Sequence, residues 1–290
     1  MEKKNTVSKP ILRKPTWITS RLSGGLEYPE IKKTLKKYHL RTICEDALCP
    51  NKGECWANKH ATFLILGNIC TRNCLFCKVS FGNPQGEIDE LEPERIAQAV
   101  KELDMKYVVI TSTTRDDLFD GGASHFARTL KCIKSLNSSV RVELLIPDFH
   151  NQENSLKTVV QEKPEVIAHN IETVRRLTPV IRHHHCSYEK SLSVLRGLKK
   201  ISGNTRIKSG LMVGLGESQD EILDTIRDIR ETETEIITIG QYLKPSKNHY
   251  EVNKFYTPDE FAEFRDFAYS IGFTRVISGP LVRSSYLAGK

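Results

Sequence analysis

The sequence predicts an α/β protein, a partial (β/α)6 barrel of the TIM type with an N-terminal arm and a short C-terminal tail. From residue 61 onward, short apolar runs alternate with amphipathic stretches, which implies parallel strands joined by right-handed crossovers. The 290 residues suffice for a barrel that forms one domain. We therefore expect an arm over residues 1–60 and a barrel with its tail over residues 61–290.

Apolar runs are the predicted strands, and capping residues mark several of the helices between them. The runs cover residues 61–67, 107–112, 140–146, 165–170, 206–214 and 235–240, with 274–279 as a further candidate. One helix opens at Glu92-Pro93, and an arm helix near 28–38 carries Ile31 and Leu35 on one face. Two helix starts have capping-box spacing: Ser218 with Glu221, and Thr257 with Glu260.

Composition is that of an ordinary globular protein, with 39% hydrophobic and 27% charged residues. No apolar run is long enough to span a bilayer, and the basic N-terminus lacks the apolar core of a secretory signal. We therefore expect a cytoplasmic protein, in which eight cysteines favour metal or redox chemistry over disulfides. The net charge of +7 is spread among acidic residues without a base-stacking platform, so we expect no nucleic-acid partner.

Six of the cysteines form two triplets, which are the most informative feature of the chain. Cys44, Cys49 and Cys55 have the spacing C-x4-C-x5-C, and Cys70, Cys74 and Cys77 follow as C-x3-C-x2-C. A closed zinc site needs four ligands, so each triplet is one ligand short. A [4Fe-4S] cluster held by three thiolates instead leaves one iron open to another ligand.

The second triplet resembles the signature of the radical S-adenosylmethionine (SAM) superfamily. It follows the apolar run ATFLILG, and Phe76 precedes its last cysteine. Together with CEDALCPNKGECW upstream and VRSSY near the C-terminus, it makes the chain similar to the lipoyl synthase family. The resemblance implies that Cys70, Cys74 and Cys77 hold a [4Fe-4S] cluster whose open iron binds SAM and cleaves it to a 5'-deoxyadenosyl radical.

Polar residues after the barrel strands are the candidate SAM contacts. The planar fork of Arg115 suits a carboxylate, although a surface ion pair with a neighbouring aspartate explains it equally well. The glycine-rich strand SGLMVGLGE resembles the superfamily pattern in which a strand approaches adenine. At the end of another predicted strand, His169, Asn170 and Glu172 could contact a ribose or the backbone of a ligand. The expected contacts are Arg115, Asp116, Asn170, Glu172, Gly214 and Glu217.

For the first triplet, the resemblance implies an auxiliary [4Fe-4S] cluster that is consumed as the source of sulfur. Its fourth ligand in the family is a serine of the RSSY motif, either Ser284 or Ser285 here. The family pattern favours Ser285. A serine oxygen is a harder and weaker partner for iron than a thiolate, which suits a cluster that must come apart.

Two cysteines lie outside the triplets. We expect Cys132 to pack within a helix and Cys186 to lie in a solvated loop after the tract His183–His185. This tract stands where the family has a short Arg-Pro-Gly turn, and the sequence assigns it no role.

The resemblance implies a sulfurtransferase that inserts sulfur at C6 and C8 of a protein-bound N6-octanoyl-lysine. Its expected partners are an octanoylated lipoyl domain or glycine cleavage H protein, a flavodoxin or ferredoxin reductant, and an iron-sulfur carrier protein. A methylthiotransferase is one alternative, but we expect it to carry an RNA-binding appendage, and only eleven residues follow Gly279. The other alternative is a zinc-dependent nucleic-acid-binding module.

Overall fold

One curved, mostly parallel sheet forms the centre of the computed structural model, which describes residues 12–19, 27–286 and 288–289. In spatial order its strands are β1 (Arg41–Thr42), β2 (Thr62–Ile65), β5 (Tyr107–Ser112), β6 (Arg141–Leu145), β7 (Val166–Ala168), β8 (Arg206–Val213), β9 (Ile236–Gln241) and β10 (Arg275–Gly279). Only β1 pairs antiparallel, against β2. Most of the basic N-terminus lies outside the described residues.

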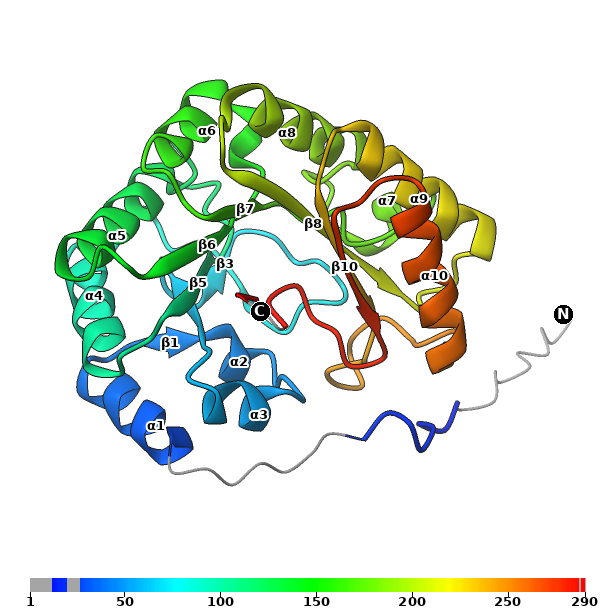
Figure 1. Ribbon diagram of the computed structural model, residues 1–290, viewed down its shortest axis with the longest axis horizontal. Coiled ribbons are helices and arrows are strands. Elements are labelled where there is room, and N and C mark those ends of the chain that lie inside the picture. The colour runs from blue at the N-terminus through cyan, green and yellow to red at the C-terminus, as the bar shows by residue number, and fades with distance from the viewer. Residues whose placement is uncertain (1–11, 20–26, 287, 290) are drawn as a thin grey trace, which may run out of the picture.

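The sheet is an open barrel, because its edge strands β1 and β10 do not pair with each other (Figure 1). Every predicted strand is present, so the partial-barrel prediction is confirmed. Two features were not predicted: β1, and a two-stranded parallel sheet of β3 (Ile69–Cys70) and β4 (Ser80–Phe81). Such two-residue strands carry no periodic signal.

Helices cover the convex face of the sheet (Figure 1). They are α4 (Glu92–Glu102), α5 (Ala123–Leu136), α6 (Glu153–Val160), α8 (Tyr188–Ile201), α9 (Gln219–Glu231) and α10 (Pro258–Ser270), with the short η1 (Phe149–Asn151) and α7 (Thr178–Ile181) in the loops. Both predicted capping boxes, at the starts of α9 and α10, are formed. None of the described helices is long and apolar enough to cross a membrane.

The arm packs onto the barrel and shares its hydrophobic core. It contains α1 (Glu27–Lys37), α2 (Ile43–Asp46) and α3 (Lys52–Ala57). The predicted apolar face of α1 is confirmed, because Ile31 and Leu35 are buried with Trp56 of α3 in the same cluster as the barrel strands. The division of the chain at residue 60 stays a prediction.

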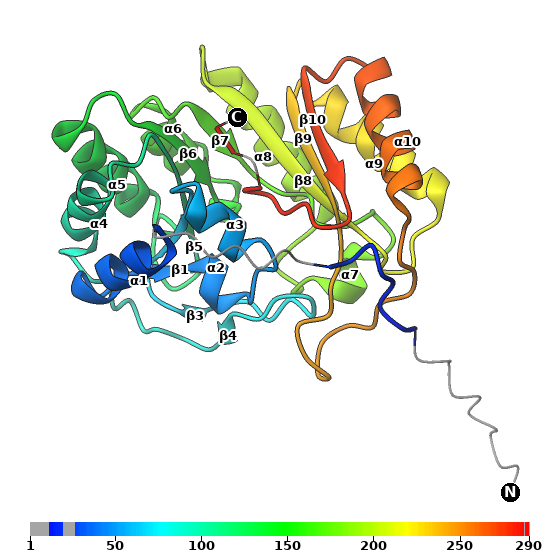
Figure 2. The ribbon, with the colours of Figure 1, turned by 60° about the horizontal axis from the view of Figure 1, so that its bottom comes forward.

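After β10 the C-terminal tail turns back into the concave side of the sheet. Figures 1 and 2 show it between the barrel strands and the α2–α3 segment. Gly240 of β9 permits this path, because a Cβ atom there would lie 2.1 Å from the carbonyl oxygen of Val282. The tail and the arm, distant in sequence, thus meet inside the open barrel.

Candidate active site with two cysteine-lined cavities

The C-x3-C-x2-C triplet lies on one short loop at the carboxyl ends of the strands. Cys70 ends β3, and Cys74 and Cys77 follow on the loop to β4. All three line a cavity of about 290 Å³. Its other walls include residues at or just after the ends of β5, β6 and β7: Thr111, Ser112, Leu145, Ile146, His169 and Asn170. The three cysteines therefore line a cavity at the edge where an α/β barrel carries its chemistry.

Backbone N–H groups point at two of these sulfur atoms. Arg72 donates its N–H to Cys70 Sγ at 3.4 Å, and His183 donates to Cys74 Sγ at 3.3 Å. Burial raises the pKa of the Cys77 thiol to about 11. Donors to sulfur favour the thiolate form and tune iron-sulfur clusters, so this set of groups fits such a cluster better than a purely apolar packing role.

Arg72, which the sequence reading did not single out, is the main charged group behind the cysteine loop. Its buried guanidinium donates to Asp116 at 2.9 and 2.7 Å and to Asp148 at 2.7 and 2.8 Å. Burial alone would raise the pKa of Asp148, yet the arginine holds it well below its usual value. The position of this arginine inside the cysteine run CTRNC is the sequence signal that could have predicted its role. The carboxylate of Asp116, an expected SAM contact, is thus already paired with Arg72.

Arg115 lies outside the lining of this cavity. Its side chain is 1% exposed and donates to Asp117 through two nitrogens, both at 2.8 Å. It also donates to the carbonyl oxygens of Leu66, at 3.1 Å, and Glu87, at 2.8 Å. Of the two alternatives that the sequence left open, the structure shows the ion pair with a neighbouring aspartate, and this guanidinium fastens neighbouring loops to one another. A direct contact of Arg115 with SAM stays a prediction.

Asn170 and Glu172, by contrast, line the cavity and show a polar atom without a partner. Asn170 Nδ2 donates to Glu172 Oε1 at 3.1 Å, whereas the buried Oδ1 of Asn170 accepts no hydrogen bond within the described residues. Gly210 makes room for this amide, since a Cβ atom there would lie 2.7 Å from Asn170 Oδ1. Burial also raises the pKa of Glu172. Such an amide oxygen is ready to accept from a ligand hydroxyl or amine.

Gly214 and Glu217 form a closed turn after β8 and do not line either cysteine cavity. The Glu217 carboxylate accepts from the backbone N–H groups of Gly214 and Leu215. Gly214 has φ +101°, and a Cβ atom there would lie 2.1 Å from Gln241 Nε2. These two expected SAM contacts therefore stabilise the conformation of their own loop.

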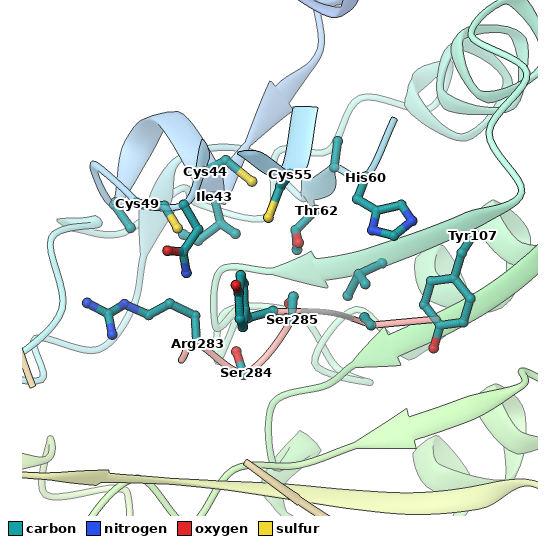
Figure 3. A pocket seen from close by; sticks show the side chains of 16 residues that line it. Ile43, Cys44, Cys49, Cys55, His60, Thr62, Tyr107, Arg283, Ser284 and Ser285 are labelled. Atoms are coloured by element: carbon teal, nitrogen blue, oxygen red, sulfur yellow. The ribbon is translucent and has the colours of Figure 1, made fainter. Parts of the chain in front are cut away.

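The C-x4-C-x5-C triplet lines a second cavity, of about 140 Å³, inside the open barrel. In Figure 3, the sulfur atoms of Cys44, Cys49 and Cys55 point toward the tail segment that carries Ser284 and Ser285. The cysteines come from α2, α3 and the loop between them. The fold thus joins three thiols with hydroxyl groups from residues more than two hundred positions away.

Burial keeps the thiols of the second cavity protonated until a metal binds. Burial, helped by the neighbouring Cys49, raises the pKa of Cys44 to about 11, and burial also raises the pKa of Cys49. Arg283 lines the same cavity, and burial lowers its pKa, an effect that Cys49 opposes. Thiols in such a site ionise when a metal binds. The three sulfur atoms and a serine oxygen therefore fit a metal cluster.

Specific contacts hold the tail in this position. Asn51 Nδ2 donates to the carbonyl oxygen of Leu281 at 2.6 Å, and the Tyr286 hydroxyl donates to the Glu54 carboxylate at 3.3 Å. Arg283 donates to the Gln241 carbonyl oxygen at 3.1 Å. The tail is therefore tied both to the cysteine arm and to the end of β9.

The two cavities are neighbours, because Ile43 and Ser284 line both of them. Ser285 lines only the second cavity. The walls of the two cavities therefore meet at these two residues.

The structure corrects one expectation about the cysteines outside the triplets. Cys186 is buried and lines the first cavity, where it accepts from Arg72 at 3.4 Å, whereas we expected it in a solvated loop. Its neighbours His184 and His185 are exposed, as a loop position implies. Cys132 lies in α5, away from both cavities, with Sγ 3.8 Å from Glu94 Oε1.

Comparisons with known proteins agree with the fold and with the cysteine loop. A sequence model of the Radical SAM superfamily matches residues 64–229. Methylornithine synthase (PylB) has a similar fold, with a TM-score of 0.57 and 11% identity over 92% of this chain and 88% of that one. The FeFe-hydrogenase maturase HydG of Carboxydothermus hydrogenoformans also has a TM-score of 0.57, with 15% identity over 91% and 75%. The family match, this fold and a three-cysteine loop define a radical SAM enzyme.

Curated relatives identify the family within this class. Lipoyl synthase of Caldicellulosiruptor saccharolyticus is 51% identical over 276 residues, which are 95% of this chain and 96% of that protein. Lipoyl synthase of Thermus thermophilus is 47% identical over 277 residues, or 96% and 86% of the two chains. The chain belongs to the lipoyl synthase family, as the sequence motifs predicted, and it is a radical SAM sulfurtransferase.

Proposed function

We propose that this chain inserts two sulfur atoms, at C6 and C8, into an octanoyl group carried on a lysine of a partner protein. The observation that supports this function is the pair of adjoining cysteine-lined cavities, which share Ile43 and Ser284 as lining residues. An octanoyl chain bound next to these two residues would have its C–H bonds beside the first cavity, where hydrogen is removed. The carbon radicals formed in this way would lie beside the second cavity, which supplies sulfur.

Each cavity would hold one [4Fe-4S] cluster. Cys70, Cys74 and Cys77 would hold the first, with SAM at its open iron, and the other triplet with Ser285 would hold the second. When bound, these groups supply the 5'-deoxyadenosyl radical and the sulfur. The two cysteine triplets would keep the radical source and the sulfur source in separate but adjoining cavities. Hydrogen abstraction and sulfur insertion would then occur on one immobilised octanoyl chain.

For SAM, we propose direct contacts from Asn170 and Glu172, which line the first cavity. The unpartnered Oδ1 of Asn170 supports this role. Asp116 would act indirectly by holding Arg72 behind the cysteine loop. Arg115, Gly214 and Glu217 would likewise act by fixing loops that border the cofactor.

The partners follow from the chemistry. The substrate would be an octanoylated lipoyl domain or glycine cleavage H protein, which the net charge of +7 attracts if that carrier is acidic. SAM cleavage needs an electron, from a flavodoxin or ferredoxin. A cluster that is consumed must be rebuilt, for which we propose an iron-sulfur carrier protein.

The eight free cysteines support a location in a reducing compartment, the cytoplasm.

The test is a Cys49→Ala variant, assayed anaerobically with SAM, dithionite and an octanoyl-lysine peptide. Wild type should add two sulfur atoms and release two 5'-deoxyadenosines, as measured by mass spectrometry. The variant should still cleave SAM but add no sulfur, because Cys49 lines only the second cavity.

Cys132→Ala is the matched control, because it removes a thiol outside both cavities and should keep both activities. A Cys49→Ala variant that still formed lipoyl groups would contradict the sulfur-donor role. If wild type cleaves SAM without adding sulfur to the peptide, the octanoyl substrate is wrong.

A further inference from the structure

Three consecutive histidines lie between α7 and α8 at the rim of the first cavity. The residues that flank them, Arg182 and Cys186, line that cavity. One ligand atom from each of His183, His184 and His185 lies within 4.8 Å of the other two. The ring centroids are 4.0, 4.9 and 4.3 Å apart. Three imidazoles are thus gathered on one face of a short loop.

The surroundings orient two of these rings in a way that suits metal binding. His185 Nδ1 lies 3.5 Å from Asp116 Oδ2, and Arg72 holds that carboxylate in place. A carboxylate that accepts from one ring nitrogen leaves the lone pair of the other nitrogen, Nε2, for a metal. His183 Nδ1 accepts only a long bond, 3.3 Å, from the backbone N–H of His185, which a metal can replace.

The loop is also held in shape before any ion binds. Lys190 Nζ donates to the carbonyl oxygen of His185 at 2.6 Å, and the buried Cys186 anchors the end of the tract. His184 is exposed, and its ring makes no hydrogen bond within the described residues. Zn–N bonds of about 2.1 Å place nitrogens roughly 3.4 Å apart, so small rotations of exposed rings complete the site.

We propose that His183, His184 and His185 form a binding site for a divalent ion of the zinc class, separate from the two cysteine sites. Three neutral imidazoles suit Zn²⁺, Co²⁺, Ni²⁺ or Cu²⁺ better than Mg²⁺ or Ca²⁺, which prefer oxygen ligands. Three ligands leave one position of a tetrahedral ion open to water or to another molecule.

This site is coupled to the first cavity. The backbone N–H of His183 donates to Cys74 Sγ at 3.3 Å. An ion that pulls the His183 ring toward its neighbours changes this hydrogen bond, and hydrogen bonds to sulfur tune an iron-sulfur cluster. Occupation of the histidine site should therefore alter the electronic properties of the cluster held by Cys74.

The experiment uses anaerobically reconstituted full-length protein, dialysed against Zn²⁺, with zinc and iron measured by mass spectrometry. We expect one zinc per chain with unchanged iron. His184→Asn should weaken zinc binding roughly 10-fold or more, since it removes one of three ligands. His39→Asn is the matched control: this histidine is also exposed and has φ 51°, which asparagine tolerates, so zinc binding should stay the same.

A second readout is the electron paramagnetic resonance spectrum of the reduced protein. Zinc should shift the spectrum of wild type and leave that of His184→Asn unchanged. Equal zinc binding by wild type and His184→Asn overturns the site, as does zinc uptake matched by loss of iron, which would place zinc at the cysteines. Zinc binding that depends on His184 without a spectral shift overturns the coupling.

Discussion

Two adjacent serines of the tail occupy different positions in the site. Ser284 lines both cavities, whereas Ser285 lines only the second. The RSSY motif leaves both serines as candidate ligands, with a preference for Ser285 from the family pattern. The placement of Ser284 on the shared wall supports a different role for it, next to the substrate chain.

We therefore predict different effects for Ser285→Ala and Ser284→Ala. Outer partners of a metal site already contribute about 10- to 100-fold to activity, so loss of a ligand from the second cluster should lower sulfur insertion at least that much. Ser285→Ala should also lower the iron content of this cluster, whereas Ser284→Ala should retain it. Mössbauer spectra and iron analysis make the comparison. The reverse pattern would make Ser284 the ligand.

His169 gives a prediction about pH. Burial lowers its pKa to about 4, against the opposing charge of Asp148, and its Nδ1 lies 3.1 Å from the carbonyl oxygen of Ile146. Below about pH 6.5 the unfolded chain therefore binds a proton that the folded chain excludes until about pH 4. The free energy of unfolding should therefore fall as the pH falls through this window, by at most about 1.4 kcal/mol for each pH unit.

Urea unfolding of wild type and His169→Asn between pH 4.5 and 6.5 measures this effect. Asparagine can donate to Ile146 but does not titrate, so the variant should lose the corresponding part of the slope. Identical slopes in the two proteins would show that His169 is not the titrating group.

At the scale of elements, β9 and the tail fit together through one glycine. A Cβ atom at Gly240 would lie 2.1 Å from the backbone carbonyl oxygen of Val282, which cannot rotate away. At Gly279 the nearest atom is a side-chain methyl of Val282, at 3.4 Å. The two glycines therefore differ in what an added methyl group displaces.

Gly240→Ala should push the tail out of the concave side and carry Ser285 away from the second triplet. We expect loss of sulfur insertion and of iron from the second cluster, while SAM cleavage and the circular dichroism spectrum stay close to wild type. Gly279→Ala should behave like wild type in all these measurements. Full sulfur insertion by Gly240→Ala would mean that the tail does not need this close approach.

At the scale of the whole molecule, the arm and the barrel share one core through the fully buried Trp56. We predict that they unfold together. In a Trp17→Phe variant, Trp56 is the only tryptophan and reports on the arm, while far-ultraviolet circular dichroism reports mainly on the barrel helices. Trp17 is 41% exposed, so its replacement should be mild.

The two signals should give the same midpoint in a denaturant titration, because neither segment can expose its side of the core alone. A lower midpoint for Trp56 fluorescence would contradict a single cooperative unit and support two domains that divide near residue 60.

By itself, the sequence determined the barrel, the two cysteine triplets and the family. Apolar periodicity and capping boxes are local signals, and the spacing of thiols on a short loop is readable without a partner. The family resemblance also implied that the tail reaches the first triplet. Only the tertiary structure showed which contacts hold it there, such as Asn51 with Leu281 and Gly240 with Val282, which join residues about 230 and 42 positions apart and leave no pattern along the chain. It likewise showed that Arg72 and Cys186 join the second triplet, whereas Arg115 does not line that cavity, because these positions depend on contacts between distant loops.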